Sequence, residues 1–249
     1  MTRHLRIVTG SSRGLGLALV AQLLARGDRV LALARGSIEV AVPEGAELLV
    51  WRADLARPVE VAERLGAWLA AQPWRDCASA TLINNAGVLP APAPLAGSDL
   101  HELSNALRVG LEAPLLLSAA FLRATSAWAC PRKLLLVSSG LGRRAMAGSA
   151  TYCAAKAGMD HLARTLALEE SARPNGAAVV SLAPGVIDTD MQVQLRSADS
   201  GRFPERIHFQ KLKDSGQLSS PALAAAMVLR ALDRADFGST PVGDVRDMA

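Results

Sequence analysis

Short, continuously apolar runs alternate with longer segments of helical periodicity along most of this chain, and this alternation restricts the possible folds most. The runs that read as strands span residues 5–9, 29–34, 47–51, 80–84, 133–138 and 177–182. The helical segments span residues 14–26, 57–72, 99–127, 151–172 and 220–233. Continuous apolar runs are typical of strands buried on both faces of a parallel sheet. We therefore expect right-handed βαβ units and a doubly wound α/β sheet with helices on both faces.

One domain accounts for the whole chain. Its 249 residues suffice for a single α/β domain over 1–249, and a hydrophobic content of 50% provides a core. Segment 197–219 is polar, contains Gly201, Pro204 and Gly216, and interrupts the alternation. Insertions after strand ends often line the binding crevice of open α/β sheets, so this segment is a candidate substrate lid. A plain surface loop is the alternative interpretation.

Charge and cysteine usage argue against several classes of protein. The net charge is +4, and its arginines are scattered singly or in pairs such as Arg143–Arg144, so nucleic acid is not an expected partner. The three cysteines and four histidines show no ligand spacing, so we expect no metal site and a reducing, cytoplasmic setting. We find no signal-peptide pattern, and uninterrupted apolar runs fall short of the roughly 20 residues that span a bilayer, so no membrane association is expected.

A glycine-rich turn, TGSSRGLG, follows the first strand at residues 9–16. Gly10 allows a sharp turn, and Gly14 and Gly16 allow backbone and helix to approach a phosphate closely. Free N–H groups at the helix start favour negative charge there. The GxxxGxG spacing differs from the GxGxxG dinucleotide fingerprint, but its place between first strand and first helix predicts a dinucleotide site.

The end of the second strand favours NADP over NAD. An NAD site would carry an acidic residue there for the ribose hydroxyls, whereas this chain has Arg35, which suits a 2′-phosphate. Arg13, within the glycine turn, is a candidate second clamp because a guanidinium pairs well with phosphate oxygens. The alternative is that both are ordinary surface arginines.

The only tyrosine of the chain, Tyr152, stands four residues before Lys156 at the start of a helix, so both lie on one helical face. A phenol can serve as acid and base at neutral pH if its anion is stabilised, and lowering its pKa by about three units needs roughly 4 kcal/mol. The Lys156 ammonium and an oxidised nicotinamide can supply that stabilisation. Ser139, after the fifth strand, can hold a substrate oxygen beside the phenol.

Taken together, these motifs resemble the short-chain dehydrogenase/reductase family over nearly the whole chain. The resemblance rests on the turn at 9–16, Asp54-Leu55, the NNAG segment at 84–87, Pro184-Gly185 with Thr189, and Ser139 thirteen positions before Tyr152. It implies a Rossmann-type fold, NADP(H) as cofactor, and Ser139, Tyr152 and Lys156 as catalytic residues. The predicted cofactor-binding residues are Gly10, Ser12, Arg13, Gly14, Leu15, Gly16, Arg35, Asp54, Leu55, Asn85, Ala86, Gly87, Tyr152, Lys156, Pro184, Gly185, Ile187 and Thr189.

One position departs from the family pattern. The family usually has Asn in the helix after the fourth strand, where a bend and a water molecule relay protons to the lysine. Here Gly110 stands at that position. Gly110 either permits the same bend, with water completing the relay, or indicates an altered proton path, and no fourth catalytic residue is assigned.

The C-terminal half resembles the sepiapterin reductases and bacterial benzil reductases of this family, through residues 152–157, 166–170 and 183–192. This resemblance implies NADPH-dependent reduction of a vicinal dicarbonyl or of a pterin side-chain ketone. It aligns Asp244 with an aspartate that anchors the guanidine-like edge of the pterin. A carboxylate can accept two parallel N–H hydrogen bonds from such an edge. The predicted substrate-binding residues are then Ser139, Tyr152 and Asp244, although a solvated C-terminal carboxylate is an equal alternative for Asp244.

Two other functions remain open: an NADP-dependent alcohol dehydrogenase of a biosynthetic pathway, which runs the same chemistry backwards, and a non-catalytic NADP-binding sensor. The resemblance also implies a homodimer or homotetramer joined through the helices at 99–127 and 151–172. Packing of these helices within one protomer would produce the same apolar pattern.

Overall fold

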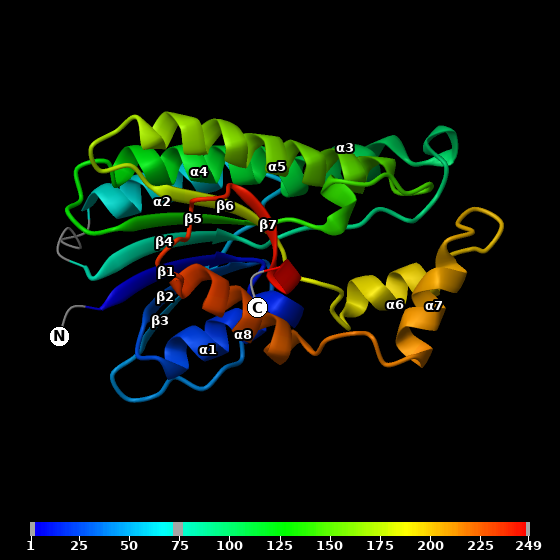
Figure 1. Ribbon diagram of the computed structural model, residues 1–249, viewed down its shortest axis with the longest axis horizontal. Helices are drawn as coiled ribbons and strands as arrows, with labels where there is room; N and C mark the ends of the chain where they lie inside the picture. The colour runs from blue at the N-terminus through cyan, green and yellow to red at the C-terminus, as the bar shows by residue number, and fades with distance from the viewer. Residues whose placement is uncertain (1–2, 72–76, 248–249) are drawn as a thin grey trace.

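The computed structural model describes residues 3–71 and 77–247, and its centre is a seven-stranded parallel sheet (Figure 1). Its strand order is β3-β2-β1-β4-β5-β6-β7. The order reverses between β1 and β4, which confirms the doubly wound α/β architecture. The strands are β1 His4–Thr9, β2 Arg29–Ala34, β3 Glu47–Arg52, β4 Ser79–Asn84, β5 Arg132–Val137, β6 Ala178–Ala183 and β7 Val242–Asp244.

Helices cover both faces of the sheet, as Figure 1 shows. On one face lie α2 Pro58–Ala71, α4 Ala113–Ala124 and α5 Ala150–Ser171, and on the other α1 Gly14–Ala25 and α8 Pro221–Asp233. Successive strand residues alternate between two cores: Ile7 and Leu134 belong to the first, Val8 and Leu135 to the second. This alternation explains the continuous apolar runs, because both sides of each inner strand are buried.

The two edges of the sheet differ from the sequence-based expectation. The run at 47–51 was expected to be buried on both faces, but β3 has only β2 as a neighbour and Val50 is 47% exposed. The short strand β7 was not predicted, since its three residues pair only with β6 and carry no apolar run. Helix 57–72 appears as α2, and its final residue, 72, lies outside the described residues.

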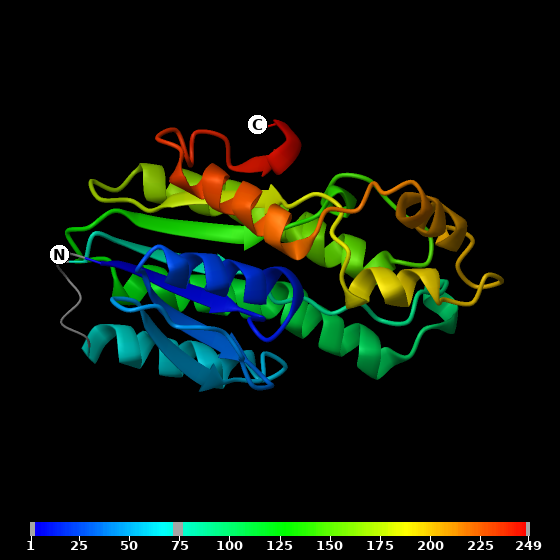
Figure 2. The same ribbon diagram turned by 90° about the horizontal axis from the view of Figure 1, so that it is seen from below.

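Segment 197–219 is more ordered than a polar loop. It contains α7, Arg206–Asp214, and follows α6, Asp190–Arg196. Phe203 and Phe209 from this segment form a third apolar cluster with Met146 and Leu195. Figures 1 and 2 show α6 and α7 projecting beyond the carboxyl ends of the strands. We call residues 190–214 the cap.

The helix predicted at 99–127 consists of α3 Leu100–Leu107, a π-helical turn Arg108–Glu112 and α4. By length and composition this stretch, Leu100–Ala124, is apolar enough to cross a bilayer, and half of its most apolar window is buried within the fold. Here α4 packs on α2, while α3 and the π-helical turn pack on α5. Packing inside the helix layer therefore accounts for its apolar side chains.

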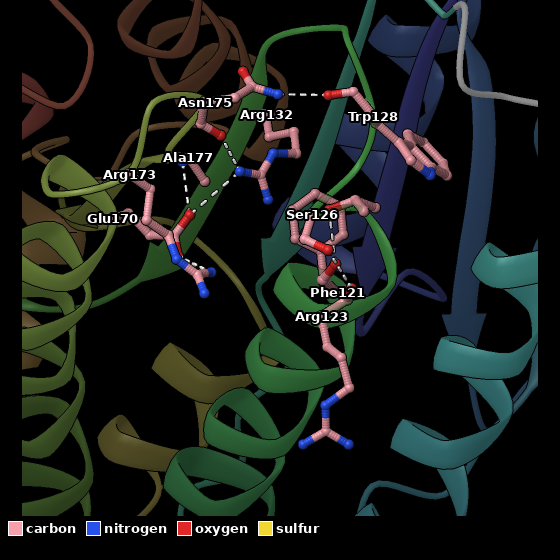
Figure 3. Close-up of polar contacts among 10 residues, drawn as sticks. Phe121, Arg123, Ser126, Trp128, Arg132, Glu170, Arg173, Asn175 and Ala177 are labelled. Carbon is pink, nitrogen blue, oxygen red and sulfur yellow. Dashed lines mark hydrogen bonds and ion pairs between the residues drawn. The ribbon is translucent and has the colours of Figure 1, made fainter.

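A buried polar network connects the C-terminal end of α5 to the amino ends of the strands (Figure 3). The Glu170 carboxylate lies 3.4 Å from Arg132 Nη2 and accepts a hydrogen bond of 2.9 Å from the Ala177 backbone N–H. Arg132 also donates to the Asn175 carbonyl, and Asn175 donates to the Trp128 carbonyl. These contacts fix the starts of β5 and β6 and lie far from the carboxyl ends of the strands.

Candidate functional site

The carboxyl ends of the strands and the cap enclose a cleft of about 780 Å³, within the range of small-molecule sites. Every residue that the sequence predicted for the site lines this cleft. They are Gly10, Ser12, Arg13, Gly14, Leu15, Gly16, Arg35, Asp54, Leu55, Asn85, Ala86, Gly87, Ser139, Tyr152, Lys156, Pro184, Gly185, Ile187, Thr189 and Asp244. The fold thus brings them together, while their individual roles stay predictions.

The glycine turn has no space for a side chain at Gly10 or Gly16. A Cβ on Gly16 would lie 2.1 Å from the Gly10 carbonyl oxygen, and Gly10 itself has a φ of 69°. Asn85 Nδ2 donates to the Thr9 carbonyl at 2.9 Å and holds the turn against the loop that follows β4. Helix α1 begins at Gly14, within this turn, and has no side-chain cap at its N-terminus. Bare backbone at a helix start is a cradle that suits a pyrophosphate.

The two predicted phosphate clamps differ in their surroundings. Arg35 is exposed and lines the cleft immediately after β2. Arg13 is engaged with Asp190 of α6, with Nη1 and Oδ2 2.9 Å apart, and both side chains are at least 70% exposed. Because exposed ion pairs contribute roughly 0–1 kcal/mol, a phosphate can compete with Asp190 for Arg13.

Two loops complete the predicted cofactor half of the cleft. The backbone N–H groups of Asn85 and Ala86 each donate to Thr9 Oγ1 at 3.0 Å, which fixes the loop after β4. Gly185 turns with a φ of 81°, and Thr189 Cγ2 would lie 3.3 Å from a Cβ on Gly14. The loop after β6 therefore lies directly against the glycine turn.

Ser139, Tyr152 and Lys156 meet at the floor of the cleft. Ser139 begins a 3₁₀ turn after β5, η4 Gly140–Gly142, while Tyr152 and Lys156 come from the first two turns of α5. Lys156 Nζ lies 5.6 Å from the centroid of the Tyr152 ring and donates to the Val137 carbonyl at 2.7 Å. The predicted one-turn spacing on a common helix face is thus present.

Burial controls the ionisation of these groups. Burial raises the pKa of Tyr152 above its ordinary value, and the hydrogen bond with the Ser139 side chain opposes this rise. Burial also lowers the pKa of Lys156 to about 8, against the opposing charge of Asp160. At neutral pH the phenol therefore keeps its proton, and the neighbouring ammonium is mostly charged.

Gly110 lies inside the π-helical turn Arg108–Glu112. A local departure from α-helical geometry is therefore present at this position without asparagine. A Cβ on Gly110 would lie 3.3 Å from the Ala155 Cβ, which stands between Tyr152 and Lys156 on α5. The π-helical turn thus packs closely against the helix that carries both catalytic candidates.

Asp244, at the end of β7, is buried and already paired. Arg246 donates to it through Nε at 2.8 Å and Nη2 at 2.7 Å, and these bonds help to lower the pKa of the carboxyl despite its burial. Arg246 also lines the cleft but was not predicted. Its proximity to Asp244 follows from the short turn η5, Val245–Asp247, which has no periodic pattern.

Sequence reasoning also missed the apolar wall of the cleft. The cap contributes Met191, Leu195, Phe209 and Leu212 to it, and Met146 adds to it from the loop before α5. Phe203 and Phe209, in a mostly polar segment, were the clearest sequence signal for this wall. Within the described part of the chain, no three His, Cys, Asp or Glu side chains are grouped to hold a metal ion.

The comparisons with known proteins agree with this geometry. The family model described as short chain dehydrogenase matches residues 5–200. A benzil reductase, (S)-benzoin forming, from Bacillus subtilis is 32% identical, covering 93% of this chain and 94% of the relative. A sepiapterin reductase from Rattus norvegicus is 31% identical, covering 97% of this chain and 96% of the relative. A metagenomic short-chain oxidoreductase solved in complex with NADP has a TM-score of 0.71 at 26% identity, covering 97% of this chain and 94% of that one.

Proposed function

The chain belongs to the short-chain dehydrogenase family of oxidoreductases, and on that premise we propose that it is an NADPH-dependent carbonyl reductase. The observation that carries the proposal is the meeting of Ser139, Tyr152 and Lys156 in the same cleft as the glycine turn. A cleft of this kind can hold a dinucleotide and a carbonyl compound side by side. Relatives named benzil reductase and sepiapterin reductase support reduction of a ketone.

The bare glycine turn and the loops at 85–87 and 184–189 would hold the cofactor. Bound NADPH would supply the hydride that reduces the carbonyl carbon. The preference for NADPH over NADH rests on Arg35, which follows β2 where a ribose 2′-phosphate would lie, with no acidic residue at positions 33–38 of the sequence. Arg13 would also bind the 2′-phosphate, once its ion pair with Asp190 is broken.

Tyr152 would donate its proton to the carbonyl oxygen. Its raised pKa keeps that proton available at neutral pH, so the phenol is an acid in the resting protein. Ser139 would hydrogen-bond the same oxygen and align it with the phenol. After proton transfer, the Lys156 ammonium would stabilise the phenolate, since an opposite charge nearby favours the ionised form.

The cleft wall favours an apolar vicinal dicarbonyl as substrate. Met146, Leu195 and Phe209 provide an apolar surface beside Tyr152. Asp244, the predicted pterin anchor, has its carboxylate engaged by Arg246, so a pterin would have to displace that guanidinium. An aryl or alkyl diketone would bind without displacing Arg246. The cap would cover the bound diketone as a lid.

The test follows NADPH absorbance with purified protein and a panel of benzil, small vicinal diketones, sepiapterin and simple ketones, with NADH in parallel. We expect turnover on vicinal dicarbonyls with NADPH, and a loss of at least about 100-fold in kcat for Tyr152→Phe with NADPH affinity unchanged. Arg35→Asp should reduce the preference for NADPH. Turnover by Tyr152→Phe at the wild-type rate would refute the mechanism, and tight NADPH binding without turnover on any carbonyl would favour a non-catalytic sensor.

A further inference from the structure

We propose that Asp160 is a positioning residue of the catalytic centre: its buried carboxylate holds the turn that carries Ser139 and acts electrostatically on Lys156. The inference rests on the proposed function and extends it to a residue outside the family motif. Asp160 lies on α5 one turn after Lys156 and is 1% exposed. It does not line the cleft, so it can act only through other groups.

One carboxylate oxygen of Asp160 connects α5 with the end of β5 and with β6. Asp160 Oδ1 accepts hydrogen bonds from Ser138 Oγ at 2.6 Å and from Ser181 Oγ at 2.7 Å. Ser138 directly precedes Ser139 at the end of β5, and Ser181 belongs to β6. Asp160 thus fixes the side chain next to the catalytic serine to both the helix and the neighbouring strand.

The other oxygen faces the turn η4. Asp160 Oδ2 lies 3.5 Å from Arg143 Nε, and Arg143 Nη2 donates to the Gly243 carbonyl in β7 at 3.1 Å. A Cβ on Gly142 would lie 2.8 Å from Asp160 Oδ2 and 2.9 Å from the Lys156 carbonyl oxygen. The turn therefore rests directly on the carboxylate, and a larger residue at position 142 would push it away.

The charge of this carboxylate is only partly compensated. Oδ2 has no hydrogen-bond donor among the described residues, and its nearest cation, Arg143, is 35% exposed on its side chain. A buried carboxylate is costly unless it is paired and fully hydrogen-bonded, so its negative charge acts on nearby cations.

Lys156 receives this effect. Burial lowers its pKa and Asp160 raises it. The titratable and hydroxyl groups around the pair are Tyr152 on α5, Arg143 directly after η4, and the neutral hydroxyls of Ser138 and Ser181. Without Asp160, burial would act on Lys156 unopposed. The lysine would then lose its proton at a lower pH.

The test compares Asp160→Asn with Glu170→Gln in the full-length protein. Both replace a buried α5 carboxylate by its amide, but Glu170 pairs with Arg132 and Arg173 at the opposite end of the helix. The pH dependence of NADPH affinity is measured by nucleotide fluorescence, and that of kcat/KM with the best diketone of the panel. An ammonium group donates stronger hydrogen bonds than an amine, so NADPH affinity should fall as Lys156 deprotonates.

We expect Asp160→Asn to lower kcat about tenfold and to move the midpoint of the alkaline fall in NADPH affinity down by about one pH unit. Glu170→Gln should leave that midpoint unchanged. An unchanged midpoint in Asp160→Asn, or the same shift in both variants, would overturn the proposal. If wild type turns over no carbonyl but Asp160→Asn still shifts the midpoint in NADPH binding, the proposed function fails and the effect of Asp160 on Lys156 stands.

A second pair of variants keeps the proposal testable if Asp160→Asn does not fold. Ser138→Ala and Ser181→Ala each remove one hydrogen bond to the same carboxylate oxygen, but only Ser138 adjoins the catalytic turn. Ser138→Ala should lower kcat at least about threefold more than Ser181→Ala at similar thermal stability. Equal kcat values in the two variants would refute the positioning role.

Discussion

At the residue scale, Lys156 occupies a position that costs the folded protein free energy. Its side chain is almost entirely buried, and burial lowers its pKa to about 8 from an ordinary value of 10.5. Its Nζ donates to the Val137 carbonyl. Functional groups of this kind are retained for chemistry at the expense of stability.

Replacing Lys156 by Met should therefore stabilise the cofactor-free protein. The lowered pKa corresponds to a cost of about 3 kcal/mol at pH 7, where both folded and unfolded chains hold the proton. Between pH 8 and 10.5 the folded chain releases the proton first, so wild-type stability should rise with pH. Urea denaturation at pH 7 and pH 9.5 measures both effects.

In Lys156→Met the gain at pH 7 should be positive and at most about 3 kcal/mol, and the rise contributed by this group should disappear. A variant less stable than wild type at pH 7 would show that the hydrogen bond to Val137 outweighs desolvation. Tyr152→Phe is a suitable control, because it removes the phenol hydroxyl and leaves Lys156 in place.

The spacing of Tyr152 and Lys156 on one helical face, combined with the other family motifs, predicted both as catalytic residues. Asp160 and Arg246 could not be identified in this way. A single aspartate within a helix gives no sign of its partners. The partners of Asp160 are Ser138, directly after β5, and Ser181, in β6. Side-chain pairs of this kind depend on strand register, which the sequence does not state.

At the element scale, the cap depends on a few aromatic contacts. Phe203 is fully buried, stacks on Phe209 with ring centroids 5.9 Å apart, and packs against Gly148, whose added Cβ would lie 2.8 Å from the ring. Gly148 lies shortly before α5. The cap is therefore anchored on the loop that leads to Tyr152.

Phe203→Ala should loosen the cap while leaving the sheet folded. Truncation of a buried Phe costs about 3–5 kcal/mol, and here the loss falls on a cluster separate from both main cores. We expect faster proteolysis within residues 197–219 and a KM for the diketone raised about tenfold, with NADPH affinity unchanged. Limited proteolysis and steady-state kinetics measure these effects.

Ile207→Ala is the matched control, because Ile207 lies on α7 but is 61% exposed. It should behave as wild type in both measurements. An unchanged KM in Phe203→Ala would argue against the cap as a substrate lid.

Periodicity predicted the strands from β1 to β6, the edge strand β3 included, but missed β7 and the cap helices α6 and α7. Strands β1, β2, β4, β5 and β6 are buried on both faces and leave continuous apolar runs. Strand β7 has three residues and one partner, and α7 has Phe209 as its only buried residue, so neither leaves a pattern. The cap is ordered by contacts with Met146, from a distant part of the chain.

At the scale of the whole molecule, the two helix layers have different outer surfaces. The layer of α2, α4 and α5, continued by α3, exposes Leu107, Leu115 and Leu168, by 39%, 45% and 75%. We propose that these side chains contribute to a homodimer or homotetramer interface through α4 and α5, since buried apolar side chains are typical of the core of a subunit interface. The opposite layer exposes Leu223 on α8, which provides a comparison.

Leu168→Glu should therefore shift the protein towards the monomer, because a charge buried at a subunit interface is strongly unfavourable when unpaired. Leu223→Glu adds the same charge to an exposed leucine of the other layer and should leave the assembly unchanged. Size-exclusion chromatography with light scattering gives the mass of each species directly. A monomeric wild type, or dissociation caused equally by Leu223→Glu, would count against an interface through α4 and α5.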